Sequence, residues 1–275
     1  MIEIPESTTI SRQAQTVMTG KTVKKVINAT YQHRFTWYNG DSEKYPALLT
    51  GKQIKTINGY GSFIDIGFTD DMHLAINDGT NLRYNQAVNQ FPEKFQLLIL
   101  LNDDSFLTFT VAMYGGIFAF KKDFDNIYYQ GSIEKLSPVS DDFNAHYFDN
   151  LINQSKPNLS MKAFLATEQR IPGLGNGVVQ DILFNAHLHP KRKLSAIGDK
   201  EKENLFYSLK TTLVDMISKN GRDTEKDIYG NQGGYKTILS KNTGSHPCPQ
   251  CGSPIIKEAY LGGSIYYCPV CQKMK

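Results

Sequence analysis

The stretch of sequence that decides the fold lies in the second half of the chain and reads Gln169-Arg-Ile-Pro-Gly-Leu-Gly-Asn-Gly-Val-Val-Gln-Asp-Ile-Leu-Phe184. Pro172 and Gly173 are expected to end one helix. Gly175 permits close approach of another backbone, and Asn176 is expected to cap the helix that follows. Such a turn leaves free backbone N–H groups at a helix N-terminus, where an anion such as a phosphate binds. The alternative is a tight corner between two helices that holds no ligand.

All the cysteines of the chain lie near its C-terminus, spaced as two Cys-x-x-Cys pairs: Cys248, Cys251, Cys268 and Cys271. Four thiolates at this spacing predict a structural zinc site that leaves no coordination position for a substrate or an activated water. The residues between the pairs must return as a hairpin, for which Gly262-Gly263 is the expected turn. The alternative, two disulfides, is disfavoured because no secretory signal is recognisable and a chain of this length needs no disulfide bonds to stabilise its fold.

Composition indicates a globular chain with an uneven charge distribution. The chain has 275 residues, of which 40% are hydrophobic, and no apolar run approaches the length of a membrane span. We therefore expect a soluble, cytoplasmic protein. Residues 1–155 hold 13 Lys and Arg against 17 Asp and Glu, a net charge of −4, whereas residues 156–275 hold 17 against 10, a net charge of +7. This asymmetry suggests that a polyanion faces the C-terminal half, although a merely solvated surface would look the same.

Short β-branched or aromatic runs separated by turn residues dominate the first half and predict an all-β sandwich or flattened barrel, with strands at 23–27, 63–68, 95–101 and 106–120. A short helix over 11–17 is expected to cover the sheet. Residues 129–142 have the composition of a linker loop. Beyond it, apolar residues recur at helical spacing and predict two helices with buried faces: Phe143, Tyr147, Phe148, Leu151 and Ile152, then Leu205, Leu209, Leu213, Met216 and Ile217.

These motifs resemble a known family. Gly173-Leu-Gly-Asn176, with Asp181-Ile-Leu-Phe184, Ala186 and His189-Pro190 behind it, is similar to the helix-two-turn-helix of the formamidopyrimidine-DNA glycosylase and endonuclease VIII family. The finger ending in Tyr267-Cys-Pro-Val-Cys-Gln272 and the linker Leu136-Ser-Pro-Val-Ser-Asp-Asp-Phe143 resemble the same family, so the resemblance covers essentially the whole chain.

The resemblance implies a two-domain α+β fold. We expect an N-terminal β-sandwich over residues 1–130, a linker over 131–142, a helix-two-turn-helix domain over 143–240 and a zinc finger over 241–275. We also expect one bound zinc ion, a nucleic-acid partner that is DNA or structured RNA, no membrane association and a monomeric chain.

At the N-terminus the sequence departs from the family. Family enzymes excise oxidised bases with an N-terminal proline, exposed by removal of the initiator Met, whose secondary amine forms a Schiff base with the sugar. Glu3 and Glu6 stand where the family has its acids, but Ile2 occupies the proline position. A bulky second residue is expected to leave Met1 in place, and an isoleucine side chain carries no nucleophilic atom.

Other positions that the family uses to hold DNA are also replaced. Gly61-Ser62 stands where the family has a phosphate-binding lysine, Gly263 replaces the finger arginine, and the residues that fill the gap left by a flipped base correspond to Ile76, Ala112 and Tyr114. His73 matches the family's phosphate-contacting histidine, and Gly175, Asn176 and Lys191 complete the implied nucleic-acid site. Each residue also has an ordinary structural interpretation. His73 would be an edge histidine, Gly175 and Asn176 a turn and a helix cap, and Lys191 a solvated lysine. The glycine-rich loop over 221–235 has no assigned role.

Two functional hypotheses follow. The chain is a nucleic-acid-binding protein on this scaffold without Schiff-base glycosylase and lyase chemistry, or it is an active, divergent DNA glycosylase/AP lyase for oxidised bases. The second would use Glu3 with a positioned water, or an amine that the motif does not identify.

Overall fold

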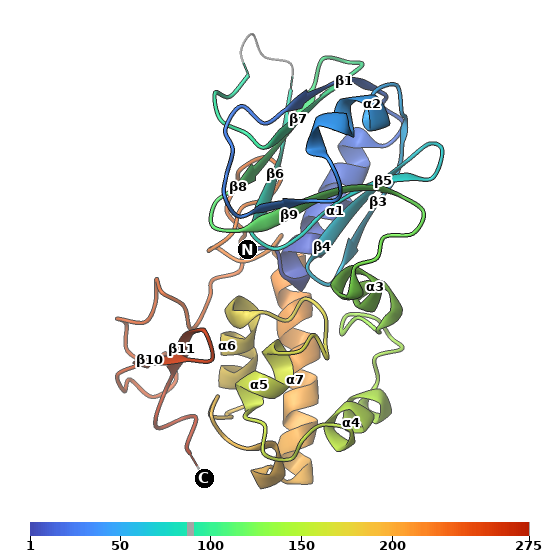
Figure 1. Ribbon diagram of the computed structural model, residues 1–275. Helices are drawn as coiled ribbons and strands as arrows, with labels where there is room; N and C mark the ends of the chain where they lie inside the picture. The colour runs from blue at the N-terminus through green and yellow to red at the C-terminus, as the bar shows by residue number, and fades with distance from the viewer. Residues whose placement is uncertain (87–90, 275) are drawn as a thin grey trace.

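The computed structural model describes residues 1–86 and 91–274, and its N-terminal half is built on two sheets (Figure 1). The five-stranded sheet has the order β2-β9-β5-β4-β3, and the four-stranded sheet has the order β1-β7-β8-β6. Neighbouring strands are antiparallel except β2 and β9, which are parallel. The strands are β1 Val23–Asn28, β2 Thr36–Tyr38, β3 Ile54–Tyr60, β4 Phe63–Phe68, β5 Met72–Ile76, β6 Thr80–Asn85, β7 Leu97–Leu101, β8 Phe106–Val111 and β9 Gly115–Lys121.

The predicted sandwich is confirmed because apolar side chains of both sheets share one core. Leu74 and Ile117 of the five-stranded sheet and Leu107 and Phe109 of the four-stranded sheet are fully buried in the same cluster. The run predicted over 106–120 divides into β8 and β9, joined by the exposed residues 112–114. Two short helices, η1 (Ser42–Lys44) and α2 (Tyr45–Leu49), follow β2.

The N-terminal helix is much longer than the sequence pattern predicted. Helix α1 spans Ile4–Met18 and packs on β3, so the expected helix over 11–17 is only its second half. Pro5 lies in the first turn, where a missing N–H costs nothing, and the Glu6 carboxylate accepts a hydrogen bond from the Glu3 N–H. The β-branched residues of this segment have a low helix propensity, so the sequence pattern did not predict the full helix. Packing against the sandwich stabilises it.

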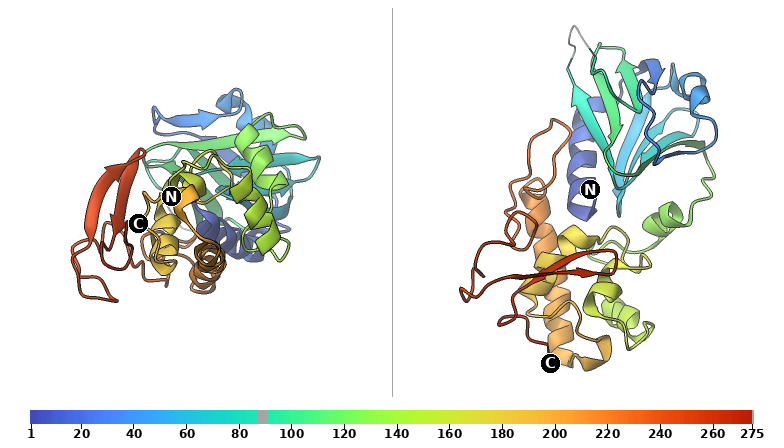
Figure 2. Two further views of the ribbon diagram at one scale, coloured as in Figure 1. Left: turned by 90° about the horizontal axis from the view of Figure 1, so that it is seen from below. Right: turned by 60° about the vertical axis from the view of Figure 1, so that its left-hand side comes forward.

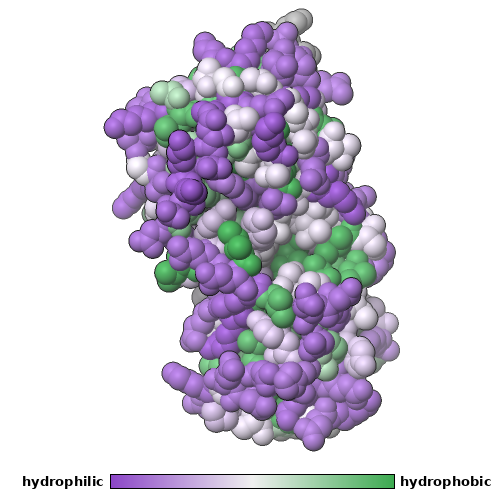
Figure 3. Space-filling view, turned by 90° about the vertical axis from the view of Figure 1, so that its right-hand side faces the viewer, coloured by the Kyte–Doolittle hydropathy of each residue, from purple (hydrophilic) through white to green (hydrophobic). Residues whose placement is uncertain are grey.

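The predicted linker loop contains a helix, α3, spanning Ile127–Glu134. Asn126 caps it by accepting hydrogen bonds from the N–H groups of Tyr128 and Tyr129. Tyr129 is buried against Phe63 and Phe120 of the sandwich, which explains why a segment with loop composition is helical. On the face that carries α3, apolar surface gathers at the level of the junction between the two halves (Figure 3).

Helices form the C-terminal half: α4 (Ala145–Asn153), α5 (Met161–Ala166), α6 (Asn176–Asn185), η2 (Leu194–Ala196) and α7 (Asp199–Ser218). The predicted helical faces are confirmed, since Phe148 and Ile152 of α4 and Leu209 and Leu213 of α7 lie in one buried cluster. Within the part of the chain that the structure describes, no helix has the length and apolar character needed to span a membrane.

A hairpin of β10 (Ile256–Tyr260) and β11 (Gly263–Tyr267) lies beside α6 (Figure 2). Its turn differs from the one expected. Tyr260 pairs with Gly263, so the two loop residues are Leu261 and Gly262, with φ of 49° and 71°. Positive φ at both positions is the requirement of a type I′ hairpin turn, and Gly263 is the first residue of the return strand.

Candidate functional site

The N-terminal residues are anchored between the two halves of the molecule. The Ile2 side chain is only 4% exposed and belongs to the core of the sandwich. The α-amino group of Met1 forms an ion pair with the Glu225 carboxylate. The residue at the position of the family proline is therefore a packing residue.

The N-terminus of α6 binds an anion, but that anion is the protein's own Glu3. Its carboxylate oxygens accept hydrogen bonds from the N–H groups of Gly177, at 2.9 Å, and Val178, at 2.8 Å. The N–H groups of Gly177 and Val178 are therefore not free, contrary to the expectation for this turn. The N-cap is Gly175 rather than Asn176, and a Cβ on Gly175 would lie 2.4 Å from Glu3 Oε1. Glycine is needed here to admit the carboxylate.

Arg222 completes this cluster and was missed by sequence reasoning. Its side chain is 2% exposed, its Nε and Nη2 donate to Glu6 at 3.0 and 2.6 Å, and Nη1 lies 3.3 Å from Glu3 Oε2. Burial alone would lower the pKa of Arg222, but the carboxylates of Glu3 and Glu6 outweigh it and raise that pKa above its ordinary value. The two acids are thus paired inside the protein.

The loop over 221–235, which had no assigned role, ties the helical half to the sandwich. It follows α7 and rises beside α1 (Figures 1 and 2). Ile228 is fully buried in the sandwich core, and its carbonyl accepts a hydrogen bond of 2.8 Å from the Tyr84 N–H on β6. Gln13 of α1 donates to Asp227 at 3.0 Å. These contacts fix the relative position of the halves.

The finger hairpin docks on α6 through Asn176. The Asn176 amide donates to the Ser264 carbonyl at 2.9 Å, and Gln180 bonds both Asn176 and Ser264 while accepting from the Tyr266 N–H. A Cβ on Gly263 would lie 3.5 Å from Asn176 Nδ2, an ordinary contact. The structure therefore brings together two positions that the family resemblance placed at the phosphates.

Two lysines lie beside this contact. The Lys162 ammonium of α5 donates to the Tyr260 carbonyl at 2.6 Å and lies 3.6 Å from the Cβ position of Gly263. Burial lowers the pKa of Lys162. No motif pointed to this residue. Lys191, which the sequence proposed as a nucleic-acid contact, forms an ion pair with Glu258 of β10 and lies over the Tyr260 ring, so its charge is already balanced.

His73 lies on the outer face of the five-stranded sheet, on a strand as expected, with a buried carboxylate behind it. Its Nδ1 is 3.0 and 3.1 Å from the two carboxylate oxygens of Asp65, which also accepts the Tyr129 hydroxyl at 3.1 Å. The ring stacks flat on Phe120 with a centroid distance of 5.3 Å. The hydrogen bond and charge of Asp65 raise the pKa of His73 above its ordinary value. No hydrogen bond within residues 1–86 and 91–274 engages Nε2, so this nitrogen is available to a ligand.

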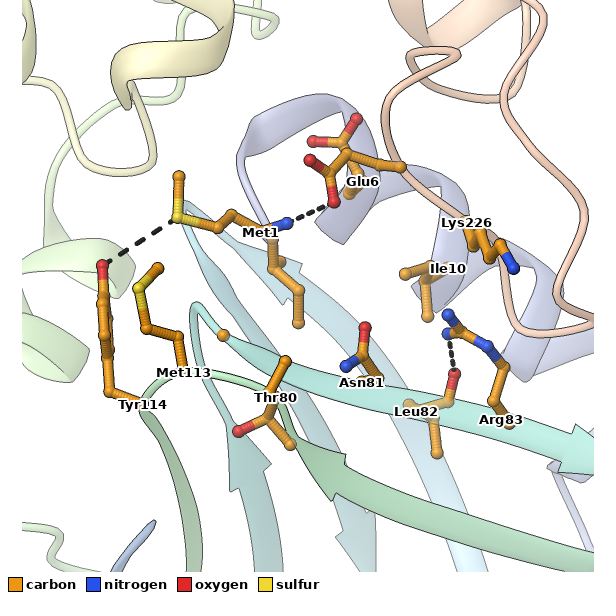
Figure 4. Close-up of a pocket in the computed structure, with 14 residues that line it drawn as sticks. Met1, Glu6, Ile10, Thr80, Asn81, Leu82, Arg83, Met113, Tyr114 and Lys226 are labelled. Atoms are coloured by element: carbon orange, nitrogen blue, oxygen red, sulfur yellow. Dashed lines mark hydrogen bonds and ion pairs between the residues drawn. The ribbon is translucent and has the colours of Figure 1, made fainter. Parts of the chain in front are cut away.

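A pocket of about 110 Å³ opens at the N-terminus between the sandwich and the 221–235 loop (Figure 4). Met1, Asn81, Arg83, Tyr114 and Glu225 are among its lining residues. Of the positions matched to the family's gap-filling residues, Ala112 and Tyr114 are exposed at this pocket, whereas Ile76 is fully buried in the sandwich core. Ile76 therefore cannot enter a gap in DNA.

The four cysteine sulfurs form one cluster, all within 4.8 Å of one another. The distance is 3.8 Å between Sγ of Cys248 and Cys271 and 3.4 Å between Sγ of Cys251 and Cys268, far longer than a disulfide bond. Tetrahedral zinc with bonds of about 2.3 Å places its sulfurs about 3.8 Å apart. The donor set and its spacing fit a closed, four-thiolate metal site.

Comparison with known proteins agrees with this architecture. The family model of the formamidopyrimidine-DNA glycosylase H2TH domain matches residues 135–227. The formamidopyrimidine-DNA glycosylases of Bacillus cereus and Lactobacillus gasseri are 27% and 26% identical to the chain, and each alignment covers 99% of both sequences.

Solved structures share the fold. The Lactococcus lactis Fpg in complex with DNA containing an abasic site superposes with a TM-score of 0.85 at 23% identity, covering 98% of this chain and 99% of that one. The MutM (Fpg) protein from Thermus thermophilus gives a TM-score of 0.81 at 21% identity and covers 99% of each chain.

Proposed function

The chain belongs to the formamidopyrimidine-DNA glycosylase and endonuclease VIII family, and we propose that it binds DNA on this scaffold without Schiff-base chemistry at its N-terminus. The observation that carries this proposal is the burial of Ile2 in the sandwich core at the position of the family's nucleophilic proline. Glu3 and Glu6 are bound by the α6 N-terminus and Arg222, which leaves neither carboxylate free to activate a water. Binding would use His73, the Asn176 and finger contact, and the basic C-terminal half.

We further propose that the four cysteines hold zinc in a structural role. All coordination positions would be filled by thiolates, so the ion would stabilise the finger without contacting substrate. Its function would be to hold β10 and β11 against α6, where Gly263 and Asn176 meet.

One observation favours the alternative of an active glycosylase. The Met1 amino group lies at the pocket, where a primary amine could meet a sugar if Glu225 released it. Borohydride trapping distinguishes the two functions, because only the active glycosylase would form a covalent adduct.

We expect the protein to bind duplex DNA containing an abasic site without forming a covalent adduct. Binding should weaken as salt rises, because phosphate contacts release counterions, and His73→Gln should lower affinity about tenfold through loss of one charge-assisted hydrogen bond. Affinity is measured by fluorescence anisotropy and adduct formation by borohydride trapping, on the same duplexes and beside a structured RNA. His146→Gln, an exposed histidine on α4, is the matched control.

Efficient trapping or base excision by the unmodified protein would overturn this proposal. Intact-mass analysis of the adduct and of the free N-terminus would then show whether Met1 or Ile2 carries the amine. Absence of DNA binding at low salt would refute both functions.

DNA affinity should also depend on pH through His73. Since Asp65 raises the pKa of His73, the imidazolium persists to higher pH than in an ordinary histidine, and affinity should fall as pH rises through that raised pKa. Asp65→Asn removes the carboxylate with little change in shape and should move the fall to lower pH. The comparison variant is Asp71→Asn, an exposed neighbour whose charge acts on His73 more weakly. Identical pH profiles for Asp65→Asn and Asp71→Asn would contradict the role of Asp65.

A further inference from the structure

An exposed aromatic patch lies on the sandwich next to the N-terminal pocket. Its members come from the segment before β2, from β2 itself and from the turn between β8 and β9: Phe35, Trp37, Met113 and Tyr114, which are 48%, 51%, 61% and 37% exposed. We call these four residues the aromatic patch. Large apolar side chains left in water side by side indicate a binding surface.

The patch is held together by the edge of the five-stranded sheet. The Gly115 N–H donates to the Phe35 carbonyl at 3.0 Å, and β2 runs parallel to β9 from there. Phe35 directly precedes β2, in a turn closed by a 3.0 Å hydrogen bond from the Thr36 N–H to the His33 carbonyl. The Trp37 and Tyr114 rings lie 6.1 Å apart at 54°, a tilted contact.

Positive charge accompanies these rings. The Arg34 guanidinium lies 5.4 Å from the Phe35 ring centroid, and His33 meets the same ring edge-on at 6.3 Å. Residues 29–38 contain no acidic side chain. Nearby, the Lys94 ammonium lies over the exposed ring of Tyr31. Aromatic faces alternating with cations are the arrangement by which proteins bind single-stranded nucleic acid, because rings stack on bases while cations neutralise phosphates.

The patch continues into the N-terminal pocket. Tyr114 and Met113 line that pocket, and the Tyr114 hydroxyl is 3.9 Å from the Met1 sulfur and 3.3 Å from Asp78 Oδ2 (Figure 4). Tyr114 stands at a gap-filling position of the family, and we propose that Phe35 and Trp37 beside it, with Arg34, add a stacking platform for unpaired nucleotides of the bound DNA. This inference rests on the proposed DNA binding and adds to it a preference for DNA with unstacked bases.

Trp37 is the only tryptophan in the chain, so its fluorescence reports on the patch alone. Titration with a short single-stranded DNA, or with a duplex carrying a single-stranded gap, should quench Trp37 and protect it from acrylamide. Trp37→Leu should weaken binding of these DNAs, measured by anisotropy, about tenfold, because stacking of one base on an aromatic residue contributes about 1 to 3 kcal/mol. Affinity for fully paired duplex should change much less.

Tyr207→Leu supplies the matched control, since that ring is 57% exposed on α7, away from the patch. If DNA binds by anisotropy while Trp37 fluorescence and acrylamide access stay unchanged, the platform is refuted and the proposed DNA binding stands. If no DNA binds, both are refuted. A change of Trp37 fluorescence on diluting the protein without DNA would assign the patch to a second copy of the chain and overturn the platform.

Discussion

Replacing Arg222 by methionine is expected to lower the free energy of unfolding by about 3 to 5 kcal/mol, the usual effect of removing one partner from a buried ion pair. The Glu3 and Glu6 side chains would keep their burial, at 4% and 5% exposed, but lose the only cation that contacts them among the described residues. The N–H groups of α6 would still bind Glu3, whereas Glu6 would lose its closest donor, Arg222 Nη2 at 2.6 Å. Equilibrium unfolding in urea, followed by circular dichroism, measures the effect.

The matched control is Arg12→Met. Arg12 is exposed on α1 and donates to Asn220 at 2.8 Å, so its replacement should change stability by less than about 0.5 kcal/mol. Combining Arg222→Met with Glu3→Gln and Glu6→Gln should restore part of the loss, because the buried charges are removed together. If Arg222→Met and Arg12→Met unfold at the same urea concentration, the buried cluster does not stabilise the junction of the halves.

Removal of the proposed zinc ion is expected to unfold the finger and leave the sandwich and the helices folded. Structural zinc contributes about 10 to 16 kcal/mol of apparent binding free energy in small fingers, far more than the little apolar cluster of Phe184, Leu239, Cys248, Tyr266 and Cys268 can supply. Elemental analysis should find one zinc per chain. After chelation, hydrogen exchange should accelerate in β10 and β11, including at the Tyr266 N–H that bonds Gln180.

Cys268→Ser should reproduce the effect of chelation, whereas His246→Ala, at an exposed position two residues before Cys248, should retain zinc. Purified protein without stoichiometric zinc, or with a disulfide within either Cys-x-x-Cys pair, would contradict the assignment of the site.

The sequence by itself determined the features whose signals are local. Cysteine spacing indicated the four-cysteine cluster, helical periodicity placed α4 and α7, and the glycine-rich turn marked the start of α6 to within one residue. Each signal works because the participating residues are neighbours in the chain, so geometry follows from spacing. The sequence pattern predicted α1 too short and did not predict α3. Their polar and β-branched residues become helical only when packed against the sandwich.

Only the tertiary structure decided which group binds at the N-terminus of α6 and which groups pair with the buried acids. Glu3 reaches the Gly177 N–H across 174 positions, Arg222 reaches Glu6 across 216, and Tyr129 reaches Asp65 across 64. A buried charge needs a counter-charge or aligned N–H groups, and either can come from any part of the chain that folding brings close. The local sequence therefore predicted an anion site at the N-terminus of α6, but only the packing of the two halves shows that the anion is Glu3.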